Sequence, residues 1–426
     1  MPVCTTSTSA WSRRRLRADT MAYKLVEIEL SEPLAAITLA SDQDGCGLIA
    51  RWRERLIGFH LVALAPGSTV SADQLEAIAD ENFAAGILTA KIEDALRFAS
   101  ISDSQRRRLS IAICTKDRAA RLARLLDALN RLAPETTFAE IEVIVVDNAS
   151  VDAETRDVVA RFPSICYIFE PKTGLNFARN AALTAAKGDL VAYLDDDVVV
   201  DRGWLAGLAE AWRSCPDAGG FTGLVLPYRL DTKAQLLFEL RGGFGRGFRR
   251  LEFRGARHGN PLYPVGAGEF GAGCNMAFKR ALLIELGGFD EALDTGAPLP
   301  GGGDLDMFYR TIRSGHTMVY EPRYAVYHEH RETMLQLRRQ YWSWGLGMMT
   351  FVVKSWRTDP VLRPLHRRMI RWWFGDRLRS FAKASLQLKG REISFALAEL
   401  RGGIRGLAGE YDRSQVRVQA IRVSHT

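Results

Sequence analysis

The chain has no apolar stretch long enough to cross a bilayer, which needs about 20 residues. Its longest such run, 341–353, is too short. The first 20 residues are rich in Ser, Thr and Arg and contain no apolar core, which excludes an ordinary secretory signal. We expect residues 1–21 to form a disordered extension, with Met21 as an alternative start of translation. These absences predict a chain without a transmembrane segment.

Cysteine is scarce and scattered along the chain. The six cysteines form no CxxC pair and no zinc-binding spacing, so we expect reduced thiols in a cytosolic protein. The sequence also lacks a GxSxG elbow, a Walker A loop, a GxGxxG loop and an HExxH helix. These absences exclude the α/β serine hydrolases, the P-loop NTPases, the simple dinucleotide dehydrogenases and the HExxH zinc proteases.

Acidic residues are few near the end of the chain. The net charge is +7, but residues 355–426 hold 15 Lys and Arg against 6 Asp and Glu. Arg and aromatic residues are mixed after Pro364, as in Arg371-Trp372-Trp373. This composition suits an anionic membrane surface, and a basic helical region that packs its aromatics on the rest of the protein is an equal alternative. We expect a cytoplasmic protein, with attachment to the inner face of the cell membrane left open.

Residues 22–100 predict a small α+β domain. The expected helix 71–99 begins with Ser71 three residues before Gln74, the spacing of a capping box. No catalytic constellation is found in this part, and the polar segment 100–108 is a plausible linker. The strands expected here are 24–30, 35–39, 48–52 and 56–64.

From Leu109 the pattern becomes strands that alternate with amphipathic helices. Such alternation predicts a parallel sheet with helices on both faces. Right-handed crossovers then place every strand-to-helix loop along one edge of the sheet. The expected strands are 109–114, 141–146, 165–169 and 190–194, and the expected helices are 119–132, 153–162, 177–186 and 204–213.

Three adjacent carboxylates, Asp195, Asp196 and Asp197, follow an apolar strand. They repel one another, and a divalent cation at the carboxyl end of the strand would relieve that repulsion. In isolation the triplet is more typical of a solvated acidic turn than of a metal site. The alternation of an extended segment predicts that Asp196 points away from the other two and tolerates Asn.

Other polar loops reach the same predicted edge of the sheet. They could simply cap the helices that follow them, but together they describe a nucleotide-sized crevice. The residues expected in this crevice are Thr115, Asp117, Arg118, Asp147, Asn148, Gly174, Asn176, Arg179 and Asn180.

Three further segments carry candidates. The glycines at 301–303 permit close backbone approach before Asp304 and Asp306, whose carboxylates either complement a helix dipole or act as a general base. Two histidines, His328 and His330, end an apolar run and are candidate metal ligands. The segment 241–250, which mixes Arg, Gly and Phe, predicts a mobile loop over an active site, although a similar composition occurs in single-stranded nucleic-acid binders.

These motifs, in this order, resemble the family 2 glycosyltransferases of GT-A fold. The resemblance covers about Leu109 to His330. It is carried by the segments 110–118, 145–150, 174–180, 194–197, 273–276, 287–291 and 301–306.

The resemblance implies an α/β catalytic domain at 109–330, with a small N-terminal domain at 22–100 and a helical, basic region at 331–426. It implies an inverting transfer of one sugar from a nucleotide-diphospho-sugar, with UDP favoured, to an acceptor hydroxyl on a sugar, a lipid-linked or another acceptor. Mn²⁺ or Mg²⁺ would be bound by Asp195, Asp197 and His328. Asp304 would be the catalytic base, and Asp306, two residues later, would also belong to the catalytic site. The donor nucleotide would contact the crevice residues named above together with Asp195 and Asp196, with Asp147 reading the base.

The sequence departs from the family pattern at two points. Cys114-Thr115 replaces the usual Pro-Thr, and Gly303-Asp304 replaces the usual acidic pair. The order of residues 338–342 is wrong for the QxxRW signature of processive synthases, which favours transfer of a single sugar over polymerisation. A metal-dependent nucleotidyltransferase and a non-catalytic sugar- or nucleic-acid-binding protein stay open as alternatives, although we expect no nucleic-acid partner.

Overall fold

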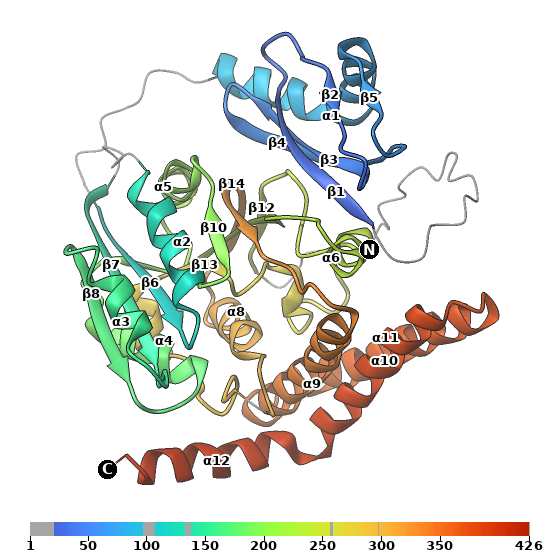
Figure 1. Cartoon of the computed structure of the whole chain (residues 1–426). Coiled ribbons are helices and arrows are strands. Elements are labelled where there is room, and N and C mark those ends of the chain that lie inside the picture. Colours follow the sequence, from blue (N-terminus) through green and yellow to red (C-terminus); the bar gives the residue numbers. More distant parts are fainter. Residues whose placement is uncertain (1–20, 97–106, 133–137, 256–258, 297, 426) are drawn as a thin grey trace.

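The computed structural model describes residues 21–96, 107–132, 138–255, 259–296 and 298–425. The N-terminal part is a small α+β unit with its own apolar core (Figure 1). The predicted capping box is present, because Ser71 Oγ accepts from Gln74 N–H and Gln74 Oε1 accepts from Ser71 N–H. The unit consists of β1 Ala22–Glu29, β2 Ile37–Thr38, β3 Gln43–Trp52, β4 Arg55–Ala63, β5 Thr69–Val70 and α1 Ala72–Leu96.

A nine-stranded sheet forms the centre of the protein, in the order β10-β14-β11-β13-β9-β6-β7-β8 with β12 beside β14. Strands β6 to β9 are all parallel, as the sequence predicts. Strand β13 is antiparallel to both of its neighbours, so the other half of the sheet is mixed. The strands are β6 Arg107–Thr115, β7 Phe138–Asn148, β8 Ile165–Glu170, β9 Leu190–Asp195, β10 Val198–Val200, β11 Gly220–Pro227, β12 Leu251–Phe253, β13 Asn275–Lys279 and β14 Met318–His328.

Helices cover both faces of this sheet, and each face has its own apolar core. Alternate residues of β6 point to opposite faces: Ala112 and Cys114 belong to one core, and Ile111 and Ile113 to the other. Strands buried on both faces read as continuous apolar runs. The helices of this part are α2 Ala119–Asn130, α3 Glu154–Val159, α4 Leu175–Ala185, α5 Trp204–Ser214, α6 Lys233–Leu240, α7 Arg280–Glu285 and α8 Gly303–Arg313, with a short 3₁₀ turn at Ala267–Glu269.

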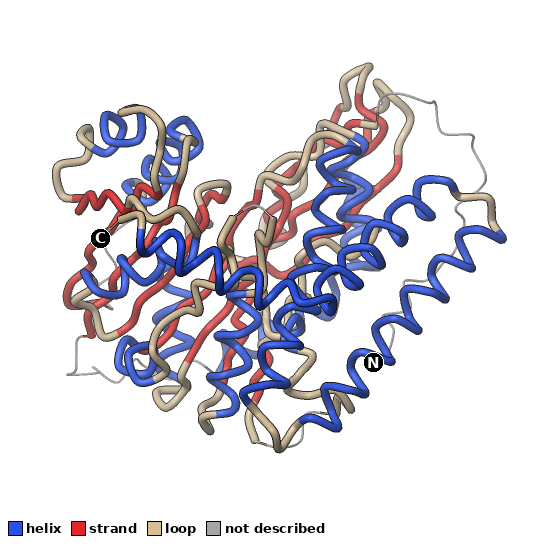
Figure 2. The backbone as a smooth tube through the Cα atoms, turned by 90° about the horizontal axis from the view of Figure 1, so that it is seen from below, coloured by secondary structure: helices blue, strands red, loops and turns tan. Residues whose placement is uncertain are grey.

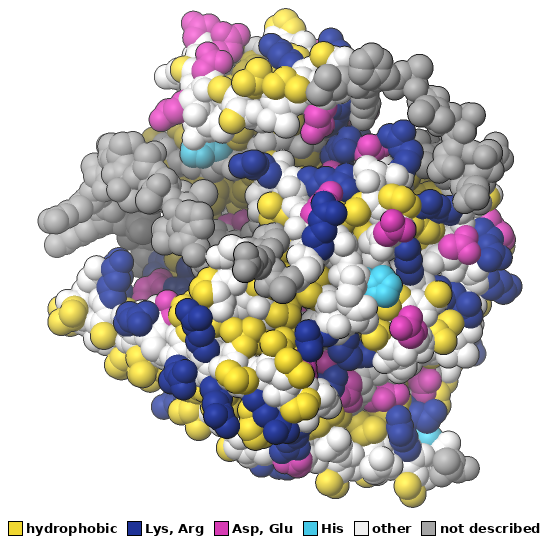
Figure 3. Space-filling view, turned by 180° about the vertical axis from the view of Figure 1, so that it is seen from behind, with side chains coloured by type: hydrophobic (Ala, Val, Ile, Leu, Met, Phe, Trp, Pro, Cys, Tyr) yellow, Lys and Arg dark blue, Asp and Glu magenta, His cyan; other side chains and the backbone are white. Residues whose placement is uncertain are grey.

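The C-terminal part is helical, and Figure 2 shows its helices nearest the viewer, across the strands. In Figure 3, Lys and Arg side chains gather among hydrophobic ones at the lower left, on the side where α10 and α11 lie. Among the described residues, no helix combines the length and the apolar character that crossing a bilayer requires. These helices are α9 Met334–Thr358, α10 Arg363–Leu386, α11 Gly390–Arg405 and α12 Tyr411–Val423, with a π-helical kink at Gly406–Glu410.

The N-terminal unit is attached to the central sheet by a buried polar cluster. The Arg51 guanidinium pairs with Glu27 of its own unit and with Asp201, which follows β10. The same guanidinium donates to the Tyr327 hydroxyl on β14. Because Arg51 is almost fully buried, this cluster fixes the position of the unit on the sheet.

Candidate active site

A large cavity opens at the carboxyl edge of strands β6, β7 and β9. It encloses about 950 Å³, within the size range of sites that hold small organic ligands. Short loops bring distant parts of the chain together here, as parallel crossovers require. The predicted residues on its wall are Thr115, Asp117, Arg118, Asn148, Arg179, Asp195, Asp196, Asp197, Asp304 and His328.

The Asp triplet does not continue the extended strand. Asp195 ends β9, and Asp196 and Asp197 form a turn before β10. The period of two does not hold in a turn, so the prediction that Asp196 points away is wrong. Its carboxylate accepts from Thr115 Oγ1 and Arg118 Nη1, both at 2.8 Å. Asp196 therefore anchors two other cavity residues, and an Asn at this position would lose the ion pair with Arg118.

Burial and mutual repulsion make the triplet electrostatically strained. Burial raises the pKa of the Asp195 carboxyl to about 7, and the neighbouring carboxylates of Asp197 and Asp196 add to this rise. Arg179, whose Nη2 lies 3.7 Å from Asp195 Oδ1, opposes it. Carboxylates whose charged form is disfavoured gain most from an added cation.

Asp197 and His328 lie close enough together to bind one cation as neighbouring ligands. Asp197 Oδ1 lies 3.4 Å from His328 Nε2. Adjacent ligands of an octahedral Mg²⁺ or Mn²⁺ lie about 3 Å apart, because each bond is about 2.1 Å long. Burial holds the pKa of His328 well below its usual range, with His330 and Arg331 adding to the effect, so its imidazole is neutral and can bind a metal.

The predicted third ligand is not assembled with these two. Within the described part of the chain, no three His, Cys, Asp or Glu side chains form a metal-binding group. The turn after β9 separates Asp195 from Asp197, and Asp195 faces Arg179 instead. Two protein ligands suit a cation that keeps several waters and takes its other ligands from substrate phosphates.

Asp304 lies at the first turn of α8 and lines the cavity. Its Oδ1 accepts from Leu305 N–H, and within the described residues no Lys or Arg forms an ion pair with it. A Cβ on Gly273 would lie 2.8 Å from Asp304 Cβ, so the glycine makes room for this carboxylate. The carboxylate is therefore half-buried and forms no ion pair with a described residue.

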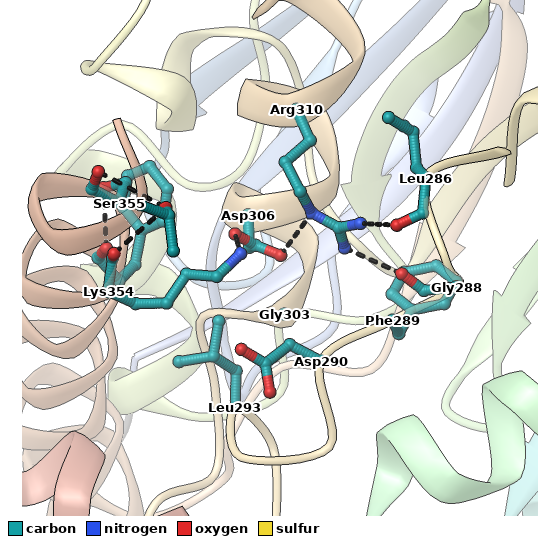
Figure 4. A network of polar contacts seen from close by, with 12 residues as sticks. Leu286, Gly288, Phe289, Asp290, Leu293, Gly303, Asp306, Arg310, Lys354 and Ser355 are labelled. Atoms are coloured by element: carbon teal, nitrogen blue, oxygen red, sulfur yellow. Dashed lines mark hydrogen bonds and ion pairs between the residues drawn. The ribbon is translucent and has the colours of Figure 1, made fainter. Parts of the chain in front are cut away.

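Asp306, predicted as a catalytic residue beside Asp304, has a different position. It is fully buried and does not line the cavity. Its carboxylate pairs with Arg310 Nε at 2.7 Å and with the Lys354 ammonium on α9 (Figure 4). A separation of two residues on a helix corresponds to about 200° of rotation around its axis, so Asp306 points away from the site. Its role is to join α8 to α9.

Several predicted donor contacts are hydrogen-bonded to other parts of the protein, and Asn148 among them also lines the cavity. Asp147 accepts from the Tyr167 hydroxyl at 2.8 Å and from Ser150 N–H, so it stands beside the cavity and its role in reading the base stays a prediction. Asn148 Oδ1 accepts from Gly174 N–H at 2.8 Å and joins two edge loops. Asn176 and Asn180 donate to backbone carbonyls of residues 289–293 and hold that loop in place.

Asp294 was not predicted as a site residue, although it lines the cavity. Its backbone has a positive φ of 65°, and its Oδ2 accepts from Arg179 Nη1 at 3.2 Å and from Gly303 N–H at 3.3 Å. Burial raises the pKa of Asp294 to about 6, while Arg179 opposes the rise. No periodic pattern marks a carboxylate in an irregular loop, which is why sequence reasoning missed it.

The far wall of the cavity comes from the Gly-rich loop and from α9. The segment 241–250 borders the cavity through Gly243, Phe244 and Arg246, in agreement with its predicted place over the site. Arg246 is held by the carbonyl of Gly268. One face of α9, with helical spacing, contributes Gln336, Arg339, Gln340, Ser343, Trp344, Gly347 and Met348.

The fold and the cavity define a doubly wound α/β domain with an acidic, phosphate-suited edge. Residues 110–287 match the model of glycosyl transferase family 2, which is the family that this part of the chain resembles. A pre-mycofactocin glycosyltransferase of Mycobacterium tuberculosis is 27% identical over 232 residues, which are 54% of this chain and 44% of that protein. The succinoglycan biosynthesis protein ExoM of Rhizobium meliloti is 29% identical over 226 residues, or 51% of this chain and 66% of that one.

The solved structures that the comparison found include the mannosyltransferase PcManGT from Pyrobaculum calidifontis in complex with GDP-Man and Mn²⁺. It is 18% identical, has a TM-score of 0.47, and the match covers 81% of this chain and 97% of that one. The chain spans about half the length of the mycobacterial relative and less than two thirds of several other curated relatives.

Proposed function

We propose that the protein is an inverting, metal-dependent glycosyltransferase that moves one sugar from a nucleotide-diphospho-sugar to an acceptor hydroxyl. The observation that carries this proposal is the placement of Asp304, the Asp triplet and His328 on one cavity. A donor bound at the triplet would present its sugar to the carboxylate at the head of α8. The names of the matched relatives support the reaction class.

The residues divide the work according to their charge. Asp197 and His328 would hold Mn²⁺ or Mg²⁺, which when bound neutralises charge on the diphosphate leaving group. Arg118, Arg179 and Arg331 line the cavity and add positive charge near the diphosphate. Asp304 takes the proton from the acceptor hydroxyl as its oxygen attacks the anomeric carbon from the face opposite the leaving group.

The acceptor enters from the side formed by α9 and the Gly-rich loop. Trp344 is partly exposed and lies beside Arg339 and Gln340, a mixture of flat apolar and polar groups. Such a wall suits a sugar or a sugar-bearing lipid. A role in polysaccharide or glycoconjugate synthesis at the inner face of the cell membrane is consistent with this wall and with the basic α10.

A thermal-shift screen of sugar nucleotides tests the proposal. We expect stabilisation by UDP-sugars that requires Mn²⁺, because a carboxylate near the base pocket can accept the uracil N3–H. Asp197→Ala should remove the metal-dependent part of nucleotide binding, measured by calorimetry, while Asp217→Ala on an exposed turn should not. Equal binding by the Asp197 variant with and without Mn²⁺ would refute metal dependence, and preference for GDP-sugars would replace the uridine assignment.

A further inference from the structure

A chain of three polar side chains runs from the cavity into the protein behind Asp197. His328 Nδ1 lies 3.0 Å from His330 Nδ1, and His330 Nε2 lies 2.6 Å from Glu239 Oε1 on α6. His328 Nε2 in turn faces Asp197 Oδ1. The three groups therefore connect the cavity to a carboxylate that is not part of its wall.

For two neutral imidazole rings, these hydrogen bonds allow one arrangement of the ring protons. An ionised Glu239 carboxylate can only accept, so His330 Nε2 must carry a hydrogen. In a neutral His330 the other nitrogen, Nδ1, is then an acceptor. His328 Nδ1 must consequently donate its hydrogen to His330 Nδ1. His328 Nε2 then carries no hydrogen, and its lone pair is directed at the Asp197 side of the cavity.

Aromatic rings enclose this chain and keep water from competing with it. The Phe244 ring stands edge-on to His328 with centroids 4.9 Å apart, and Phe238 stands edge-on to His330 at 4.7 Å. Trp344 packs against both phenylalanines at 5.7 Å. The two histidines are only 5% and 2% exposed, so each ring nitrogen depends on the partners named here.

The Gly-rich loop leaves room for the carboxylate at the end of the chain. A Cβ on Gly243 would lie 2.5 Å from Glu239 Oε1. Gly243 also has a φ of 48°, which disfavours other residues. Both facts keep the space beside Glu239 open, so its carboxylate can reach His330.

We propose that Glu239 and His330 are positioning residues that hold His328 in the Nδ1–H tautomer. In this tautomer Nε2 carries no hydrogen and can bind the divalent cation. This inference rests on the metal dependence proposed above. Groups behind a metal-binding histidine commonly fix its tautomer and raise its basicity, and their loss costs 10- to 100-fold in metal affinity. The segment 241–250 then has a second function, because it borders the cavity and also shields the hydrogen-bonded side chains of His328, His330 and Glu239 from water.

The first experiment measures the tautomer in the metal-free protein. Two-bond ¹H–¹⁵N spectra of histidine-labelled protein separate Nδ1–H rings from Nε2–H rings, and a His328→Gln variant assigns the signal among the seven histidines. We expect His328 to carry its hydrogen on Nδ1 in the wild type. In Glu239→Leu we expect this preference to be lost, whereas Glu239→Gln should retain part of it through its carbonyl oxygen. An Nε2–H ring in the wild type overturns the inference.

The second experiment measures Mn²⁺ binding directly. Titration followed by electron paramagnetic resonance, with UDP or GDP present, should show a 10- to 100-fold weaker affinity in His330→Phe and Glu239→Leu. Phe at 330 is close to the volume of His and fits among aromatic neighbours. Matched controls are His60→Phe on β4 and Glu252→Leu on β12, which should bind Mn²⁺ as the wild type does. Unchanged affinity in both test variants would contradict the role of Glu239 and His330.

The two experiments separate this inference from the proposed function. If the wild type binds no Mn²⁺ with any nucleotide, metal-dependent transfer fails, and the inference about metal binding falls with it. If Mn²⁺ binds but the tautomer is Nε2–H, only the inference fails. Thermal unfolding curves of all variants show whether a loss of binding reflects a loss of folding.

Discussion

At the scale of single residues, two aspartates close together on α8 have different surroundings. Asp304 faces the cavity without a cationic partner, whereas Asp306 pairs with Arg310 and Lys354. A carboxylate that forms ion pairs with Arg or Lys side chains is a poor base, because these cations stabilise its charged form. We therefore assign the proton transfer to Asp304 alone.

Replacement of Asp304 tests this assignment. We expect Asp304→Asn to reduce transfer by 100-fold or more, since general-base catalysis contributes about 10² to 10⁴ in rate. Donor binding, measured by calorimetry, should stay close to that of the wild type because the amide keeps the shape of the carboxylate. Near-normal turnover in this variant would remove Asp304 from the mechanism.

Asp294 gives a prediction about pH. Its pKa is raised from 3.8 to about 6, so between these values the folded protein binds a proton that the unfolded chain does not. The contribution of Asp294 to stability is therefore fully present below about pH 4 and is lost as pH rises through about 6. The charged groups that act on it are Arg179, which opposes the shift, and Asp304, which adds to it.

Denaturation of the wild type and Asp294→Asn across that pH range measures the effect. The free energy of unfolding of the wild type, minus that of the variant, should fall as pH rises from about 4 to about 6. A difference that stays constant, or that grows with pH, would contradict a raised pKa of Asp294 in the folded protein.

At the scale of elements, helix α9 joins the C-terminal region to the α/β domain. It provides one wall of the cavity, and its Lys354 forms an ion pair with Asp306 of α8. Gly302 on the loop before α8 lies close to the α9 backbone, since a Cβ there would be 3.0 Å from Gly347 O. The loop that carries Asp304 is thus positioned by the C-terminal helices.

Breaking that buried pair should destabilise the fold. We expect Asp306→Asn to lower the free energy of unfolding by about 3–5 kcal/mol, because the Lys354 ammonium stays buried without its partner. The double variant Asp306→Asn with Lys354→Met should recover part of this loss. Asp217→Asn is the matched surface control and should change stability by less than about 0.5 kcal/mol. Equal stability of Asp306→Asn and Asp217→Asn would contradict the structural role.

At the scale of the whole molecule, the basic surface of α10 bears on where the protein works. Arg367, Arg368, Arg371 and Trp372 are exposed on this helix, while Trp373 is buried. One aromatic packs inward and its neighbour faces solvent, so attachment to a membrane stays a prediction. The exposed residues suit an anionic membrane surface.

Flotation with liposomes tests membrane attachment. We expect the protein to float with vesicles that contain anionic lipid and to remain behind with neutral vesicles. Changing Arg367, Arg368 and Arg371 to Glu should abolish flotation, since each basic residue near an anionic surface contributes about 1 kcal/mol. A control with Glu at Arg131, Arg161 and Lys187 has the same net charge. Loss of flotation in both variants would indicate a non-specific charge effect.

Local patterns predicted most of the elements but not the contacts between them. The apolar strands and the Ser71 capping box depend on neighbours in sequence, so they could be predicted. The antiparallel strand β13 and the pairing of β14 with both β10 and β11 depend on the packing of distant segments. The position of Asp196 was mispredicted because a turn replaces the expected extended backbone.

The sequence by itself determined the class of fold and the acidic edge of the sheet, because strand-to-helix loops of a parallel sheet must meet at one edge. Only the tertiary structure separated Asp304 from Asp306, brought Asp294 to the cavity and placed Glu239 behind His330. Each of these depends on which cation or ring faces a side chain across the fold. Such a partner comes from a segment far away in sequence, and no local spacing encodes it.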